Sequence, residues 1–417
     1  MTMMKIKRSL QTVATVALAG LALACPSSDE AKKIGVVLPL SGEDVTYGES
    51  IREGLELGLD EVNARSEVPV QFTIDVQDSK SSPEGAAEAY RVAASEAIAV
   101  IGGATSPEAL ALAPLADSDQ KVLLSPTASS PELSRVSQWF YRIFPSSEAE
   151  AVAMSRFLND KTWLQPEVAV ALIADEPYGR GAADSLGEVL DGGFDAEVTF
   201  PAGTADLTAQ IDEVLAAFPQ RDDPEKARVV FVAARGGDLF RAISGLRTAG
   251  FNANHHWVFA TSALASPFVM SNLGVDANRV FFAQGAFDVE SEEEPMKSFV
   301  AAYELRYGRK PDLYAAHGYD AIHVLGQASI EAPNVQFPSD ILTGMRSISN
   351  YQGATGNIQF RESGDVQKFA RMFYVDDGEI VDYQEWEEER QKERADRMRE
   401  LQRRQEELNR RLNAVEN

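Results

Sequence analysis

The feature that most constrains the fold is a repeated alternation of apolar runs of strand length with amphipathic stretches of helix length. Residues 34–38 form one buried-strand run. The next helix has Ile51, Leu55 and Val62 on one face, and residues 70–76 form the following strand. Further strand runs lie at 97–101, 122–124, 168–173, 229–233 and 257–260, with helices such as 149–159 and 239–249 between them. This rhythm is typical of parallel βαβ units, and it predicts an α/β protein.

The number of βαβ units is too large for one compact sheet, so the sequence predicts two doubly wound parallel-sheet lobes. In such folds a ligand binds where the carboxyl ends of the strands meet the loops that enter the helices. The search for a site therefore concentrates on these loops.

The N-terminal residues resemble an export signal. A basic start precedes an apolar stretch over residues 13–23, which is too short to span a bilayer. Small residues then precede Cys25, the only cysteine of the chain, as in the lipobox of bacterial lipoproteins. We predict a signal peptide over 1–24, lipidation of Cys25, and a linker over 25–32. The alternative is a plain signal peptide beside an incidental cysteine, because Ala22 occupies the position where a lipobox usually has leucine.

The net charge of −25 leaves no basic surface to attract phosphates, which argues against nucleic-acid binding. After the leader, the sequence contains no uninterrupted apolar run long enough for a transmembrane helix. We therefore expect an exported protein of the cell envelope or periplasm, held to a membrane by its lipid anchor.

Residues 384–417 are rich in Glu, Arg and Gln and contain neither Gly nor Pro, which predicts one long helix. Opposite charges recur four residues apart, as in Glu400 with Arg404. Apolar residues fall on a coiled-coil seam that Gln405 interrupts: Met398, Leu401, Leu408, Leu412 and Val415. The seam leaves two alternatives open, a coiled-coil contact with a partner or a second copy, and a solvated helix.

Two segments that follow predicted strands carry the signals of a helix start, residues 105–108 (Thr-Ser-Pro-Glu) and residues 129–132 (Ser-Ser-Pro-Glu). At a helix start, hydroxyl groups and unpaired backbone N–H groups meet the positive end of the helix dipole. Such a place suits a carboxylate. The alternative is that these residues only cap their helices.

Several motifs, taken in order, resemble the periplasmic leucine/isoleucine/valine-binding protein family. They lie at residues 34–42 with 47–48, 102–106, 125–129, 177–179, 314–321 and 351–356. The resemblance covers residues 33–382 and implies two doubly wound lobes joined by a three-strand hinge, the type I periplasmic binding protein fold. It implies a first lobe of residues 33–145 and 284–350, and a second lobe of residues 146–283 and 351–383.

The resemblance also implies a ligand-binding site. In the family, serines and threonines at the two helix starts bind the ligand's α-carboxylate, and aromatic rings pack against the ligand. Carried onto this sequence, the hydroxyl and backbone group comprises Ser106, Thr127, Ala128 and Ser129, with Thr105 beside them. The aromatic group comprises Tyr47, Tyr178 and Tyr314.

One position departs from the family. The loop after residues 257–260 carries an acidic residue in the family, where it pairs with the ligand's ammonium, and Ser262 stands there in this chain. A hydroxyl cannot neutralise a buried cation. Either another carboxylate reaches the ligand, with Asp238 or Glu176 as the candidates, or the ligand is not a simple α-amino acid. Arg235 either favours an anionic ligand or points to solvent.

The sequence shows no phosphate loop, dinucleotide fingerprint, nucleophile elbow or paired cysteines, so we expect neither an enzyme nor a cofactor or metal. The resemblance implies a receptor that captures an amino acid or a related small carboxylate and docks on the membrane permease of an ABC importer. The alternative is an envelope interaction, regulatory or sensory lipoprotein that uses the same fold without transport. The charged C-terminal helix favours this second interpretation more than an importer subunit would require.

Overall fold

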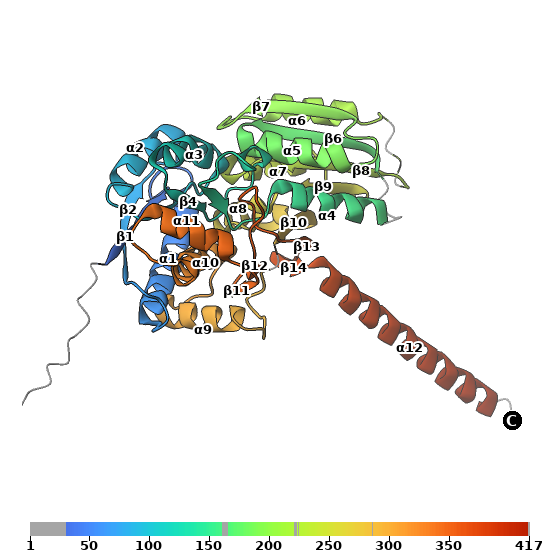
Figure 1. The fold of residues 1–417 in the computed structure, drawn as a ribbon. Coiled ribbons are helices and arrows are strands. Elements are labelled where there is room, and N and C mark those ends of the chain that lie inside the picture. Colours follow the sequence, from blue (N-terminus) through green and yellow to red (C-terminus); the bar gives the residue numbers. More distant parts are fainter. Residues whose placement is uncertain (1–30, 161–165, 221–222, 224, 286, 416–417) are drawn as a thin grey trace, which may run out of the picture.

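The computed structural model describes residues 31–160, 166–220, 223, 225–285 and 287–415. The predicted signal peptide and Cys25 lie outside the described residues. The described chain forms two α/β lobes side by side, and a single long helix projects away from the second lobe (Figure 1). The predicted fold class, two doubly wound lobes followed by a C-terminal helix, is confirmed.

The first lobe contains a five-stranded parallel sheet. In sheet order its strands are β2 (Phe72–Asp78), β1 (Lys32–Leu38), β3 (Ala99–Gly102), β4 (Val122–Ser125) and β5 (Phe140–Arg142). Its helices are α1 (Val45–Ala64), α2 (Pro83–Ala93), α3 (Ser106–Asp119), α9 (Met296–Tyr307), α10 (Leu313–Glu331) and α11 (Pro338–Ser347). Alternate side chains of each strand enter separate cores on the two faces, one with α1 and α10 and the other with α2 and α3.

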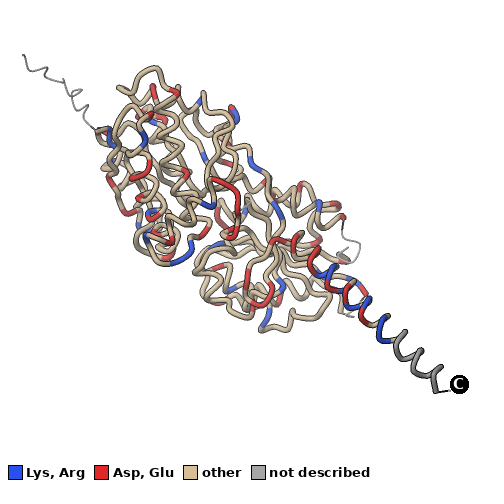
Figure 2. Tube along the Cα trace, turned by 90° about the horizontal axis from the view of Figure 1, so that it is seen from below, with Lys and Arg blue, Asp and Glu red and all other residues tan. Residues whose placement is uncertain are grey.

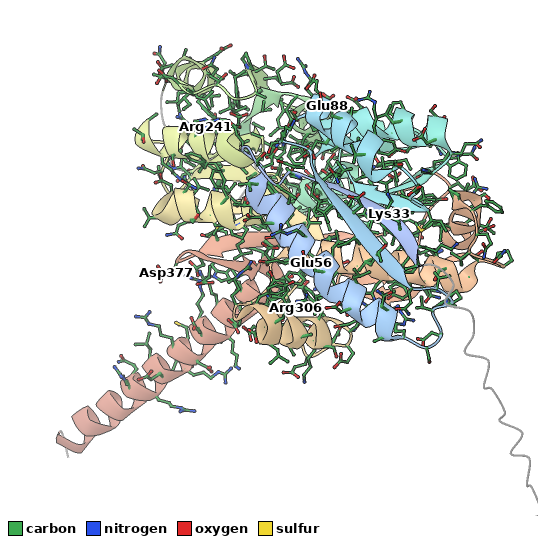
Figure 3. The ribbon with its side chains drawn as sticks, turned by 90° about the vertical axis from the view of Figure 1, so that its left-hand side faces the viewer. Lys33, Glu56, Glu88, Arg241, Arg306 and Asp377 are labelled. Atoms are coloured by element: carbon green, nitrogen blue, oxygen red, sulfur yellow. The ribbon has the colours of Figure 1, made fainter. Side chains whose placement is uncertain are left out.

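Helix α9 extends this lobe at its lower edge. Figure 3 shows it beside α1, with Arg306 labelled on α9 and Glu56 on α1. The Arg306 guanidinium pairs with Asp60 at 2.5 Å. Two segments far apart in the sequence therefore build one lobe.

The second lobe contains a seven-stranded sheet. In sheet order its strands are β14 (Glu379–Asp382), β13 (Ala370–Asp376), β10 (Val280–Gly285), β9 (His256–Ala260), β8 (Ala227–Ala233), β6 (Pro166–Asp175) and β7 (Ala196–Pro201). Its helices are α4 (Ser147–Asp160), α5 (Pro177–Val189), α6 (Thr208–Ala217), α7 (Gly236–Thr248) and α8 (Pro267–Leu273). Five strands are parallel, and β13 and β14 add an antiparallel edge that the periodicity did not distinguish.

Near the C-terminus the chain stays in the first lobe longer than expected. A short antiparallel hairpin of β11 (Tyr351–Gly353) and β12 (Gly356–Ile358) packs on the first core, where Ile358 is fully buried. The chain joins the second sheet only at β13. The boundary expected at residue 351 is therefore too early, because Ile358 and Phe360 find their apolar partners in the first lobe.

Two connections between the lobes are joined by hydrogen bonds and an ion pair of one buried arginine, Arg142. Arg142 ends β5, just before the chain enters the second lobe, and its side chain is fully buried. Its Nε donates to Asp365, in the last connection, at 2.6 Å, and its Nη1 donates to the Ser130 carbonyl at 2.7 Å. A buried charge with these partners fixes the geometry of the hinge.

The C-terminal helix α12 spans Tyr383–Val415 and confirms the predicted helix. Its first turn packs on the second lobe, where Tyr383 is buried and the Trp386 indole donates to Asp376 at 2.7 Å. Beyond this turn the helix projects free of the lobes, with acidic and basic residues interleaved along it (Figure 2). Met398 and Leu401 are exposed, so the coiled-coil contact stays a prediction.

Candidate functional site

The carboxyl ends of strands from both sheets face one another across a cleft between the lobes. The cleft contains about 380 Å³ of space between protein atoms, part of it open to solvent. Its lining from the first lobe is Tyr47, Ala104, Thr105, Ser106, Thr127, Phe144 and Tyr314. Its lining from the second lobe is Tyr178, Arg235, Ser262 and Ala263. Loops from both lobes thus contribute to one site, as parallel sheets predict.

Two of the predicted tyrosines are brought together by a close helix contact. Helices α1 and α10 approach so closely that a Cβ on Gly54 would lie 1.9 Å from the Ala315 carbonyl oxygen. Only glycine fits at this crossing. The approach places Tyr47 on α1 and Tyr314 on α10 edge to face, with ring centroids 4.7 Å apart. Burial raises the pKa of Tyr47 to about 12, so its phenol stays protonated at neutral pH.

The first helix start forms as predicted. Thr105 precedes α3, and its backbone N–H faces Glu108 at 3.5 Å in a capping box. The second one differs, because residues 131–133 form only a single 3-10 turn. The Ser106 hydroxyl oxygen joins the two segments, since it accepts hydrogen bonds from the backbone N–H of Ser129 at 3.3 Å and of Ser130 at 3.1 Å.

The other residues predicted for this wall differ in which of their hydrogen-bonding groups lack a protein partner. Thr127 Oγ1 donates to the Ala104 carbonyl at 2.6 Å and keeps its acceptor capacity. The Ala128 N–H donates to Ser125 Oγ at 3.2 Å, and Ala128 does not line the cleft. Ser129 is fully buried, and its hydroxyl has no hydrogen-bond partner within the described structure. Of these residues, Ser129 has the unmet hydrogen-bonding capacity.

Arg235 neither points to solvent nor stands free for an anion. Its guanidinium crosses the cleft and pairs with Asp44, just before α1 in the first lobe, at 2.6 Å. It also lies 3.5 Å from Glu176, in its own lobe. Burial acts to lower the pKa of Arg235, but Asp44 and Glu176 outweigh it and raise the pKa. Asp44 and Glu176 are buried on either side of this cation, so the three side chains form an ion-paired contact between the lobes.

Neither candidate for the missing acidic partner lies free beside Ser262. The Asp238 carboxylate accepts from the Gly203 N–H at 2.9 Å and pairs with Arg241 at 2.6 Å, and Asp238 does not line the cleft. The Glu176 carboxylate is paired with Arg235 at 3.5 Å. The position of Asp238 and Glu176 in the sequence does not predict these partners, because some of them come from loops that are distant in the chain and adjacent in the fold.

The carboxylate beside Ser262 belongs to Glu150, which the sequence reasoning did not identify. Glu150 lies in the first turn of α4, directly after the first crossover, and it is 5% exposed. Burial raises its pKa to about 8, while the hydroxyl and backbone N–H of Ser262 act to lower it. Its Oε1 has no hydrogen-bond partner within the described structure. The available signal was an acidic residue in the first turn of a helix that starts at a lobe crossover.

Comparison with known proteins agrees with this arrangement. The family model described as periplasmic binding protein matches residues 32–379, which include both lobes and every residue that lines the cleft. The chain belongs to the periplasmic binding protein family. The predicted resemblance to leucine/isoleucine/valine-binding proteins is confirmed.

Curated relatives of this periplasmic binding protein match over most of their own length. The Leu/Ile/Val-binding protein BraC3 of Rhizobium johnstonii is 24% identical over 394 residues, covering 89% of this chain and 99% of the relative. The Leu/Ile/Val-binding protein homolog 1 of Brucella abortus is 24% identical over 353 residues, covering 82% and 89%.

Solved structures share the fold. LivJ of Streptococcus pneumoniae, crystallised with isoleucine, matches with a TM-score of 0.74 at 23% identity, covering 84% of this chain and 98% of LivJ. The leucine-binding protein LivK of Thermotoga maritima matches with a TM-score of 0.76 at 22% identity, covering 84% and 97%. A solute-binding protein of R. palustris in complex with benzoate matches with a TM-score of 0.73 at 17% identity, covering 85% and 96%.

The described residues contain no cluster of three His, Cys, Asp or Glu side chains that could hold a metal ion. None of the helices in the described part of the chain has the length and apolar character needed to cross a membrane.

Proposed function

We propose that this protein captures an amino acid or a related small carboxylate in the cleft and delivers it to the permease of an ABC importer. The observation that carries the proposal is a set of buried polar atoms without hydrogen-bond partners in the described structure. Tyr47 Oη belongs to a residue that lines the cleft, and Ser129 Oγ and Glu150 Oε1 belong to residues next to the lining residues Ser106 and Ser262. Leaving such atoms unsatisfied costs free energy, and a small polar ligand between the lobes removes that cost. The curated relatives named as Leu/Ile/Val-binding proteins support the amino-acid class.

The predicted hydroxyl and aromatic residues have separate roles in this proposal. The ligand's carboxylate binds at the start of α3, beside Thr105 and Ser106, with Thr127 in the lining and Ser129 behind Ser106. The helix dipole of α3 favours the negative charge there. The ligand's apolar part packs against the rings of Tyr47, Tyr178 and Tyr314.

Movement about the hinge between the lobes captures the ligand. The lobes close on the ligand, and closure forms the contact of Arg235 with Asp44 across the cleft. The closed form then presents edges of both lobes to the permease. Lipidation of Cys25 holds the receptor near that membrane, and replacing Cys25 with Ser is expected to release it into the soluble envelope fraction.

The decisive experiment is a thermal-shift screen of the chain from Pro26 onward against the twenty L-amino acids and small organic acids that include benzoate. A ligand at a thousand times its dissociation constant stabilises the folded state by about 4 kcal/mol, which shifts the melting temperature by several degrees. Stabilisation by an amino acid or small acid supports the receptor. A flat response to the whole panel contradicts it.

One observation favours a second function, an envelope interaction or regulatory protein without transport. Helix α12 projects beyond the lobes with Met398 and Leu401 exposed, and transport by a hinged receptor does not require it. Gene neighbourhood separates the two functions, because a transport receptor is expected beside genes for a permease and an ATPase.

A further inference from the structure

The carboxyl group of Glu150 has no cationic partner among the described residues. It is buried next to Ser262, it does not itself line the cleft, and Oε1 is without a hydrogen-bond partner among the described groups. Ser262 and Tyr178 line the cleft, and their hydroxyl oxygens lie 3.5 Å apart. The carboxylate therefore lies directly behind the second-lobe wall of the cleft.

We propose that Glu150, together with Ser262, binds the ammonium group of the ligand. This inference rests on the proposed function and narrows it, since it selects ligands that carry a positive charge on the second-lobe side. An isolated carboxylate in such a place is costly, and an ammonium group at hydrogen-bond distance compensates that cost. Ser262 then contributes its hydroxyl to the same group.

The cleft's other charges do not compete for this role. Arg235 pairs with both Asp44 and Glu176 at their end of the cleft, so each of these carboxylates already has a cationic partner. Of the described residues, no Lys, Arg or His is among the groups that shift the pKa of Glu150. The titratable group facing it from α5 is Tyr178, whose pKa is raised first by burial and then by Glu150.

The proposal implies an exchange of a proton for the ligand's charge. With its pKa raised to about 8, Glu150 is protonated in most molecules without ligand at neutral pH. An ammonium group bound beside it stabilises the ionised form, so binding releases this proton. Affinity is therefore expected to rise with pH up to about 8 and then to level off.

The test measures binding to the chain from Pro26 onward by isothermal titration, with L-leucine as the probe. Another amino acid replaces L-leucine if it gives a larger shift in the thermal screen. The matched probe is 4-methylpentanoate, which is leucine without its ammonium. Wild type is expected to bind 4-methylpentanoate about 100-fold more weakly than L-leucine, and Glu150→Gln is expected to bind L-leucine about 100-fold more weakly than wild type.

Three controls separate a binding role from a structural one. Glu148→Gln removes the same charge from an exposed position in the same turn of α4 and is expected to leave affinity within about twofold. Adding Ser262→Glu to Glu150→Gln returns a carboxylate to the cleft wall and is expected to restore part of the lost affinity. Titrations of wild type in two buffers of different ionisation enthalpy, near about pH 7, are expected to show proton release that Glu150→Gln lacks.

The outcomes distinguish this inference from the function on which it rests. If wild type binds L-leucine or another amino acid and Glu150→Gln binds it equally well, Glu150 is not the ammonium site and the receptor function stands. Equal affinity for L-leucine and 4-methylpentanoate leads to the same conclusion. If no amino acid of the panel binds wild type, both the amino-acid function and the role of Glu150 are wrong.

Discussion

The two walls of the cleft differ in how they handle charge. The first-lobe wall offers hydroxyl groups and a helix start, from Thr105 and Ser106 at α3 and Thr127 after β4. On the second-lobe side, Arg235 lines the cleft, and the carboxyl groups of Glu176 and Glu150 lie next to the lining residues Arg235 and Ser262. Neutral dipoles on one side suit the ligand's anion, and an unpaired carboxylate on the other side suits its cation. Under the proposed function, the two lobes together set the orientation of the ligand.

The largest expected effect comes from breaking the contact that joins the two walls. Arg235→Met leaves Asp44 and Glu176 buried without their cation in the closed form, which costs about 3–5 kcal/mol. In the open form, water reaches both carboxylates. The loss in binding free energy, measured by titration, is therefore expected to exceed the loss in folding free energy of the ligand-free protein, measured from its melting temperature. An equal loss of binding free energy and of folding free energy would show that the contact of Arg235 with Asp44 and Glu176 does not depend on closure.

A second prediction concerns how the stability of the ligand-free protein depends on pH through Glu150. The pKa of Glu150 is about 8 in the folded protein against an ordinary value of 4.5, so the folded state holds this proton more tightly than the unfolded state. The ligand-free wild type should therefore lose stability relative to Glu150→Gln as pH rises from 4.5 to about 8, and no further above it.

Chemical unfolding of both proteins across that pH range measures the difference. Burial also raises the pKa of Glu108, to about 7, but this group is common to both proteins and cancels. A stability difference that is the same at every pH would contradict the burial of an uncompensated carboxyl at position 150.

A smaller effect is expected from the hydroxyl wall. Ser129→Ala removes a hydroxyl that has no protein partner in the described structure, so affinity should fall about tenfold with little change in melting temperature. Ser106→Ala should weaken binding and also lower the melting temperature, because it leaves the backbone N–H groups of Ser129 and Ser130 without their acceptor. Titration and thermal melts measured together separate the two effects, and identical behaviour of both variants would refute the assignment.

The smallest effect on binding is expected from the tail. Tyr383 and Trp386 belong to the second lobe, and the Arg390 guanidinium lies 4.8 Å from the Trp386 ring centroid. A truncation must therefore begin after Arg390. It is expected to leave ligand affinity unchanged, while sedimentation of the full and truncated proteins tests whether the remaining helix associates. Equal monomer masses would remove the coiled-coil prediction.

The sequence predicted the site unequally in the two lobes. Ser106 and Thr127 follow strands in a local pattern, so their position in the cleft could be predicted from neighbours in the chain. Glu150 is brought to Ser262, which stands 112 positions later in the sequence, by the packing of α4 against the sheet, and nothing local marks that contact. Asp238 carried a suitable local signal, yet its carboxylate turns to Gly203 and Arg241.

By itself, the sequence determined the alternation of strands and helices, the α/β class with two lobes, and the long charged helix, because periodicity and composition act over short stretches of chain. Only the tertiary structure decided the antiparallel edge of β13 and β14, the pairing of Arg235 with Asp44 and the position of Glu150. These features depend on which loops the two sheets bring together. The pKa and the partner of a buried charge are set by that packing and not by its neighbours in sequence.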